Sequence, residues 1–174
     1  GGTGGAGTGR SAVSARQSGL FRANLLDLEP EGARRVGDEG EHLLGESLEG
    51  EAMELGWMRV NEWGVGTDDY RRMVLKKTAW YSFIHPMRIG ALVAGADDDL
   101  DRFNRFGFLL GAAFQIQDDV LNLVGSHSRY GKEIAGDLCE GKRTLVLSHA
   151  FARAAPSERS WLQDFFPPPR ARRL

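Results

Sequence analysis

Cysteine is almost absent from this sequence. Cys139 is the only one, so no internal disulfide can form and nothing indicates a zinc site. No apolar run is long enough to span a bilayer, and no signal-peptide pattern opens the chain. The net charge of −2 excludes the broad basic surface that is typical of nucleic-acid-binding proteins. We therefore expect a cytoplasmic protein with no nucleic-acid partner and no stable membrane insertion.

Composition divides the 174 residues into three parts. Residues 1–19 are rich in glycine and are predicted to be a disordered or linker-like segment. They do not form a phosphate-binding loop, because no Gly-Lys-Ser/Thr ending follows the glycines. Residues 20–165 are long enough for one domain with a sizeable core. Residues 166–174 are predicted to be a tail rich in proline and arginine.

Hydrophobic periodicity predicts helices only, and no segment shows the alternation of a strand. Pro86 should kink or interrupt the second helix, because proline has no N–H and clashes with the preceding turn. The segment from Gly125 to Glu140 is expected to be a loop. The predicted helices cover about residues 30–62, 68–92, 100–124 and 142–154, with a short one near Ser157.

The most informative segment is a run of polar residues inside the third predicted helix. Gln115, Asp118, Asp119 and Asn122 fall at positions i, i+3, i+4 and i+7, which lie on one face of a helix. The rest of that helix is apolar on nearly every side, so we expect it to be buried. Buried carboxylates need a positive partner. Mg²⁺ suits carboxylate and amide oxygens and shares its coordination with substrate phosphates. An exposed acidic pair is the alternative, which the apolar surroundings disfavour.

Basic residues that suit phosphate groups lie elsewhere in the chain. Lys132, Asp137 and Lys142 follow the acidic helix, in a segment that taken alone would be a solvated loop. Lys77 and Thr78 are expected in mid-helix, where one lysine of the pair Lys76–Lys77 should be solvated. A metal with nearby lysines would provide the charge that a diphosphate requires. His85 is assigned no role, and residues 97–99 are expected to cap a helix.

Four segments together resemble the trans-isoprenyl diphosphate synthases, the polyprenyl synthetase family. FQIQDDVLNL followed by GKEIAGDLCEGKRTL is similar to the second aspartate-rich region, which usually reads FQxxDDxxD and continues with Gly-Lys, Gly-Asp and Gly-Lys. LKKTAW resembles the Lys-Thr helix of the family, and EGEAMEL resembles its Gly-Gln-x-x-Asp/Glu-Leu segment. The four matches occur in family order over roughly residues 20–165.

The resemblance implies an all-α isoprenoid-synthase-type bundle around a central apolar cavity, usually as a homodimer. It implies Mg²⁺-dependent, head-to-tail condensation of isopentenyl diphosphate with an allylic diphosphate, as in geranylgeranyl and polyprenyl diphosphate synthases. By position, Asp118 and Asp119 would bind Mg²⁺. The allylic diphosphate would contact Lys77, Lys132 and Lys142, and Thr78 and Gln115 would line the reaction centre together with Lys77.

Three departures from the family pattern accompany the resemblance. Asn122 replaces the third Asp of the motif, and Glu51 replaces the Gln of the Gly-Gln segment. Asn122, Asp137 and Glu51 are therefore further site candidates. The first aspartate-rich motif has no counterpart in the chain, so the first helices of the bundle are expected to be missing and the isolated chain to be inactive. Two alternatives stay open: a non-catalytic regulatory subunit that pairs with a complete synthase, and a related class I terpene cyclase.

Overall fold

The computed structural model describes residues 28–96, 99–125 and 134–166. Within these ranges all regular structure is helical, which confirms the predicted all-α class. The described helices are not long and apolar enough for any of them to cross a membrane. The elements are α2 (Pro30–Val60), α3 (Thr67–Val74), η1 (Leu75–Ile84), α4 (His85–Val93), α5 (Arg102–Val124), α7 (Gly136–Glu140), α8 (Leu145–Arg153) and α9 (Pro156–Phe165).

The long helix α2 has the start and the end that its sequence favours. Pro30 occupies the first helical turn with Glu31, where a missing N–H costs nothing and a negative charge suits the helix dipole. The helix ends at Asn61, whose φ of 56° is left-handed, a conformation that asparagine tolerates better than most residues. The predicted helix near residues 30–62 is therefore confirmed.

The second helical stretch runs through α3, η1 and α4 without an intervening loop. Its central part, η1, is a π-helix, and the His85 N–H bonds to the Trp80 carbonyl five residues earlier. Pro86 follows in the first turn of α4. Proline has no backbone N–H to donate. The predicted disturbance at Pro86 thus takes the form of a change from π-helical to α-helical hydrogen bonding next to this residue.

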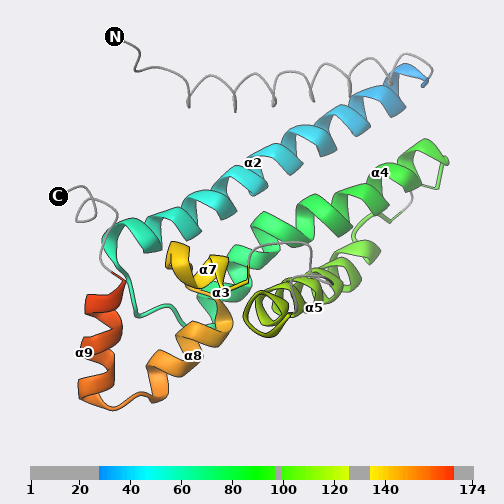
Figure 1. Ribbon diagram of the computed structural model, residues 1–174. Coiled ribbons are helices and arrows are strands. Elements are labelled where there is room, and N and C mark those ends of the chain that lie inside the picture. Colours follow the sequence, from blue (N-terminus) through cyan, green and yellow to red (C-terminus); the bar gives the residue numbers. More distant parts are fainter. Residues whose placement is uncertain (1–27, 97–98, 126–133, 167–174) are drawn as a thin grey trace, which may run out of the picture.

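η1 is the central element, with α2 packed on one side and α5 on another (Figure 1). Two buried glycines allow this close approach. A Cβ on Gly50 of α2 would lie 2.4 Å from the backbone nitrogen of Lys77, and a Cβ on Gly111 of α5 would lie 2.7 Å from the Cα of Ala79. The backbones of three helices therefore meet at the segment of η1 that carries Lys77 and Thr78.

The C-terminal helices α7, α8 and α9 pack around a separate small core. Trp63, Leu147 and Phe166 are buried together there. The Arg143 guanidinium stacks 4.0 Å from the Trp63 ring centroid and donates hydrogen bonds to the Glu62 and Gly141 carbonyls. Two details differ from the sequence prediction. α7 lies in the predicted loop, and Phe166, assigned to the tail, is buried.

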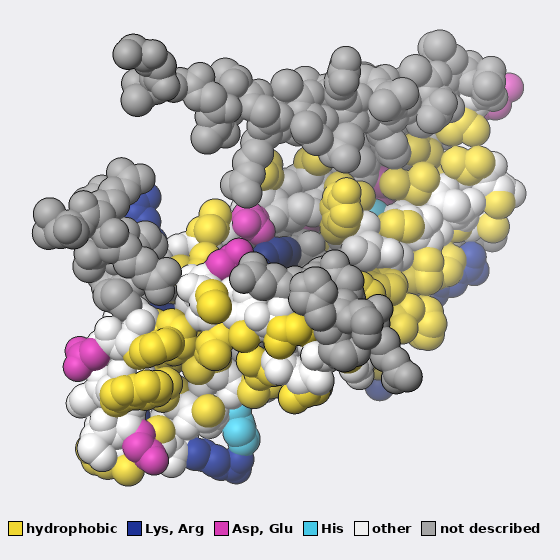
Figure 2. Space-filling view, in the orientation of Figure 1, with side chains coloured by type: hydrophobic (Ala, Val, Ile, Leu, Met, Phe, Trp, Pro, Cys, Tyr) yellow, Lys and Arg dark blue, Asp and Glu magenta, His cyan; other side chains and the backbone are white. Residues whose placement is uncertain are grey.

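The expectation that α5 is buried on nearly every side is wrong. Its buried residues are Gly107, Gly111, Asp119 and Asn122, while several of its large apolar side chains are exposed and the others are only partly buried. Figure 2 shows apolar side chains spread over one face of the molecule. The exposed apolar residues of α5 are Phe106, Leu109, Leu110, Phe114, Ile116, Leu121 and Val124.

Candidate functional site

The predicted polar face of α5 is turned into the protein, and Asp119 is its most buried carboxylate. Only 4% of Asp119 is exposed. The Tyr70 hydroxyl of α3 donates to Asp119 Oδ2 at 2.7 Å, and Gln115 Nε2 donates to Asp119 Oδ1 at 2.9 Å. The Thr78 hydroxyl of η1 donates to Gln115 Oε1 at 2.8 Å. Three of the predicted site residues, Thr78, Gln115 and Asp119, therefore form one hydrogen-bonded chain.

Among the described residues, the side chains that donate hydrogen bonds to Asp119 are the neutral Tyr70 and Gln115. Burial raises the pKa of Asp119, and the nearby carboxylates of Asp137 and Asp118 act in the same direction. The hydrogen bonds from Tyr70 and Gln115 oppose that rise. Burial and the charge of Asp119 also raise the pKa of Tyr70, so the phenol stays protonated and remains a donor. A cation placed here would relieve the charge of several carboxylates at once.

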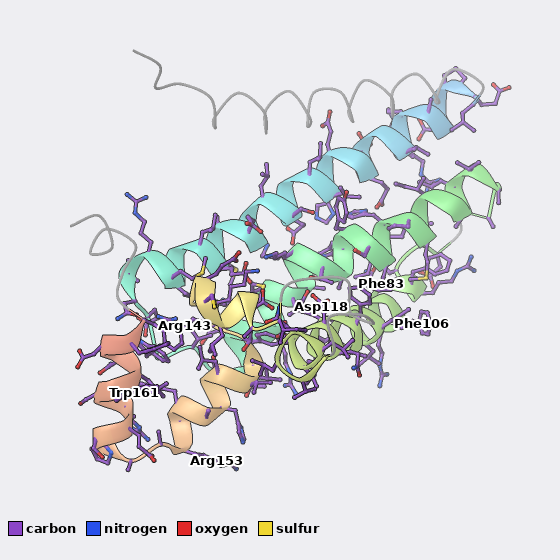
Figure 3. The ribbon with its side chains drawn as sticks, viewed as in Figure 1. Phe83, Phe106, Asp118, Arg143, Arg153 and Trp161 are labelled. Carbon is purple, nitrogen blue, oxygen red and sulfur yellow. The ribbon has the colours of Figure 1, made fainter. Side chains whose placement is uncertain are left out.

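Asn122 and Asp137 link α5 to the short helix α7. Asn122 is buried, and its Oδ1 accepts a hydrogen bond from the backbone N–H of Asp137 at 3.2 Å. Its carbonyl accepts from the Ala135 N–H at 2.7 Å. Asn122 thus satisfies N–H groups at the start of α7, which a helix leaves without internal partners. Figure 3 shows Asp118, which is half-buried, where α5 passes α7.

Two of the three predicted diphosphate-binding lysines can be placed, and both are ion-paired. Lys142 Nζ lies 2.6 Å from Asp137 Oδ1 and 3.1 Å from Glu140 Oε2. Burial opposes its charge, but these carboxylates outweigh burial and raise the pKa of Lys142. Lys77 contacts Glu54 and lies 3.0 Å from Glu51 Oε2. Lys132 lies outside the described residues.

Glu54 and Tyr70 are site residues that sequence reasoning did not single out. The Glu54 carboxylate contacts Lys77 and acts electrostatically on Tyr70 and Lys142, so it lies between the lysines and the aspartate network. Its spacing of three residues from Glu51 on α2 was an available signal, because such residues share a helix face. No comparable signal marked Tyr70, since its role depends on how α3 meets α5.

Other residues considered from the sequence have structural contacts. Lys76, expected to be solvated if Lys77 faces the site, instead pairs with Glu46 at 2.9 Å and Glu49 at 2.8 Å. His85 is fully buried in contact with Glu39 and His42. Residues 97 and 98 of the acidic turn lie outside the described residues.

Comparison with known proteins identifies relatives with matching sequence and fold. Geranylgeranyl diphosphate synthase of Saccharolobus solfataricus is 32% identical over 115 residues, which is 66% of this chain and 34% of the relative. Octaprenyl diphosphate synthase of Escherichia coli is 33% identical over 111 residues, covering 63% and 33%. The chain thus spans about a third of the length of these curated relatives.

The fold is shared with a solved structure of Trypanosoma brucei farnesyl pyrophosphate synthase. The TM-score is 0.71 at 21% identity, and the likeness covers 79% of this chain and 43% of that one. The family model described as Polyprenyl synthetase matches residues 30–171. That range contains every described residue of the candidate site, from Glu51 to Lys142. The chain belongs to the polyprenyl synthetase family.

Proposed function

We propose that this chain provides the diphosphate-binding half of the active site of an isoprenyl diphosphate synthase, a prenyltransferase that condenses an allylic diphosphate with isopentenyl diphosphate. The observation that carries the proposal is the meeting of separate elements at one place. α5 contributes the aspartates, η1 contributes Lys77 and Thr78, and the segment after α7 contributes Lys142. In a family of prenyl diphosphate synthases, such a set suits the phosphate end of the substrate.

The residues present fit Mg²⁺ that is bound together with a diphosphate. Among the described residues, no group of three or more His, Cys, Asp or Glu side chains could hold a metal ion by itself. Mg²⁺ is usually held by one or two carboxylates, with water and substrate phosphates completing its shell. Asp118 and Asp119 supply that number. Bound Mg²⁺ would supply positive charge to a departing diphosphate.

The remaining side chains have roles that follow from their contacts. Tyr70 and Gln115 hold the Asp119 carboxylate in a fixed orientation, because each of its oxygens accepts one of their hydrogen bonds. Lys77 and Lys142 keep their ammonium protons, since neighbouring carboxylates raise the pKa of each. Both can therefore donate to phosphate oxygens. Thr78 positions Gln115 and is itself placed beside Lys77 by η1.

The proposal is tested by titrating the chain with inorganic pyrophosphate in a calorimeter, with and without Mg²⁺. Binding is expected only when both are present, and farnesyl diphosphate should replace pyrophosphate. Lys77→Gln should weaken binding about tenfold, the usual size of a charge-assisted hydrogen bond. Lys76→Gln is the matched control, because Lys76 lies next in the chain but pairs away from the site, and it should leave binding unchanged. Equal losses in the two variants would refute the assignment of Lys77.

A further inference from the structure

Glu51 places a negative charge where the Gly-Gln-x-x-Asp/Glu-Leu segment of the family has a neutral amide. The structure shows which side chain the Glu51 carboxylate contacts. Glu51 Oε2 lies 3.0 Å from Lys77 Nζ, and Glu54, one helical turn further along α2, contacts the same ammonium group. Lys77, which is proposed to bind a phosphate oxygen, therefore already has two anionic partners within this chain.

The backbone holds this ion pair in place. Gly50, directly before Glu51, contacts the backbone of Lys77 so closely that a Cβ on Gly50 would lie 2.4 Å from the Lys77 nitrogen. α2 and η1 thus cross at the residues that carry the pair. The Lys77 side chain is 29% exposed, and the two carboxylates outweigh the effect of burial and raise its pKa. The pair is better shielded than an ordinary surface ion pair, which contributes little.

The two carboxylates differ in what else they contact. The Glu54 side chain is 12% exposed and also acts on Tyr70 and Lys142, so it belongs to the interior of the site. The Glu51 side chain is 38% exposed and contacts Lys77 from the outer side. With Glu51, Lys77 and Glu54 the local charge is −1, whereas glutamine at position 51 would make it zero. A diphosphate approaching Lys77 therefore meets excess negative charge.

We propose that Glu51 competes with the diphosphate for Lys77 and so sets how weakly this chain binds a diphosphate. The inference rests on the proposed function, because it requires Lys77 to bind a phosphate oxygen. An incoming phosphate oxygen displaces the Glu51 carboxylate from Nζ and then remains close to it, and this repulsion opposes binding. Glu51 is thus an affinity-determining residue of the site.

The test compares the dissociation constants of inorganic pyrophosphate, measured at constant Mg²⁺, for matched variants. Glu51→Gln should bind about ten times more tightly than the natural chain, which corresponds to about 1.4 kcal/mol. Glu51→Asp keeps the charge and should remain weak. Glu49→Gln is the control, because Glu49 pairs with Lys76 outside the site, and it should not change binding. Circular dichroism melts establish that each variant is folded.

Two outcomes separate failure of the inference from failure of the proposed function. If pyrophosphate binds and Lys77→Gln weakens it, but Glu51→Gln binds no more tightly, the competition is refuted while the site stands. If no variant binds pyrophosphate, the proposed function fails and the inference fails with it. The double variant Glu51→Gln/Lys77→Gln should bind no more tightly than Lys77→Gln, because Glu51 acts by occupying Lys77. Tightening that persists without Lys77 would also refute the competition.

Discussion

At the scale of single residues, Asp119 combines deep burial with neutral hydrogen-bond partners. Burial raises the pKa of Asp119, so its negative charge opposes folding in the absence of a cation. Asp119→Asn should therefore raise the melting temperature of the metal-free chain by a few degrees, as often happens when a functional residue is neutralised. The asparagine oxygen can still accept from Gln115, and its amide can donate to the Tyr70 hydroxyl.

The same variant should lose pyrophosphate binding in the presence of Mg²⁺. A melt followed by circular dichroism gives the first quantity, and calorimetry gives the second. Asp164→Asn on the exposed surface of α9 is the control and should change neither. A lower melting temperature for Asp119→Asn would mean that the carboxylate stabilises the fold, and the proposed conflict between charge and burial would be wrong.

Residue spacing predicted correctly which residues share one face of α5, but the sequence did not predict correctly how far this helix is buried. The positions i, i+3, i+4 and i+7 correctly placed Gln115, Asp119 and Asn122 on one face of α5. The prediction that this helix is surrounded by protein failed, because apolar composition does not say which neighbours are present to cover it. Contacts that join distant segments, such as Tyr70 with Asp119, depend on helix crossings that one-dimensional periodicity does not contain.

At the scale of helices, the crossing of α2 over η1 depends on the missing side chain of Gly50. Alanine at this position would place its Cβ 2.4 Å from a backbone nitrogen, which forces the helices apart. Gly50→Ala should lower the free energy of unfolding by about 2 kcal/mol, or roughly 6 °C in melting temperature. Gly45→Ala on the same helix has open space around it and should raise stability by up to about 1 kcal/mol. Changes in stability of opposite sign for these two glycine-to-alanine substitutions would establish the close contact at Gly50. Changes of the same sign would refute it.

A second contact between helices ties α2 to α4 through a buried histidine. His85 Nδ1 lies 2.5 Å from Glu39 Oε2, and His85 Nε2 lies 3.1 Å from His42 Nδ1. A neutral histidine has one donor and one acceptor, so Nδ1–H donates to Glu39 and Nε2 accepts from His42. Arg88 also pairs with Glu39, at 2.6 Å. The network therefore contains a neutral histidine beside the Glu39 carboxylate, whose negative charge is balanced by Arg88.

This histidine should make stability depend on pH. Burial lowers the pKa of His85 below its ordinary value, and this effect outweighs the opposing contact with Glu39. As the pH falls below about 6.5, the unfolded chain gains a proton on His85 that the folded chain does not. The free energy of unfolding is therefore unaffected by His85 above that pH and declines as the pH falls below it. Melting temperatures measured from pH 8 to pH 5 should show the decline.

Two variants separate His85 from the other titrating groups. His85→Gln should lower the free energy of unfolding at pH 8 by about 1–3 kcal/mol for the lost buried contacts. Its melting temperature should show a flatter decline between pH 7 and pH 5.5. His149→Gln on α8 removes an exposed histidine and should keep the original slope. An unchanged slope in His85→Gln would assign the pH dependence to another group.

At the scale of the whole molecule, the sequence predicted the order and approximate bounds of the long helices but not which of their faces are exposed to solvent. The start of α2 was predictable because Pro30, in its first turn, acts locally. The short helix α7 was not, since its first N–H groups are satisfied by Asn122 from another helix. Nor did periodicity indicate η1, whose π geometry accompanies Pro86 and the close crossings at Gly50 and Gly111.

The largest consequence at this scale is the apolar stripe along α5. Phe106, Leu109, Leu110 and Phe114 are each more than 40% exposed, and the stripe continues to Val124 at 75%. A contiguous apolar surface on a helix is a site of association, because covering it removes apolar area from water at about 25 cal/mol for each Å². The family members that share this fold are longer chains. We therefore expect this chain to associate with itself when it is studied alone.

Size-exclusion chromatography with light scattering checks this expectation directly. The natural chain should elute with a mass above that of one chain, and its apparent mass should increase with concentration. Phe106→Lys combined with Leu109→Lys introduces charge into the stripe and should shift the chain toward a monomer, without lowering its helical content. Val93→Lys, which adds charge at an exposed position of α4, is the control and should leave the association unchanged. A sharp monomer peak for the natural chain would refute association through α5, because the exposed stripe would then be tolerated in water by a single folded chain.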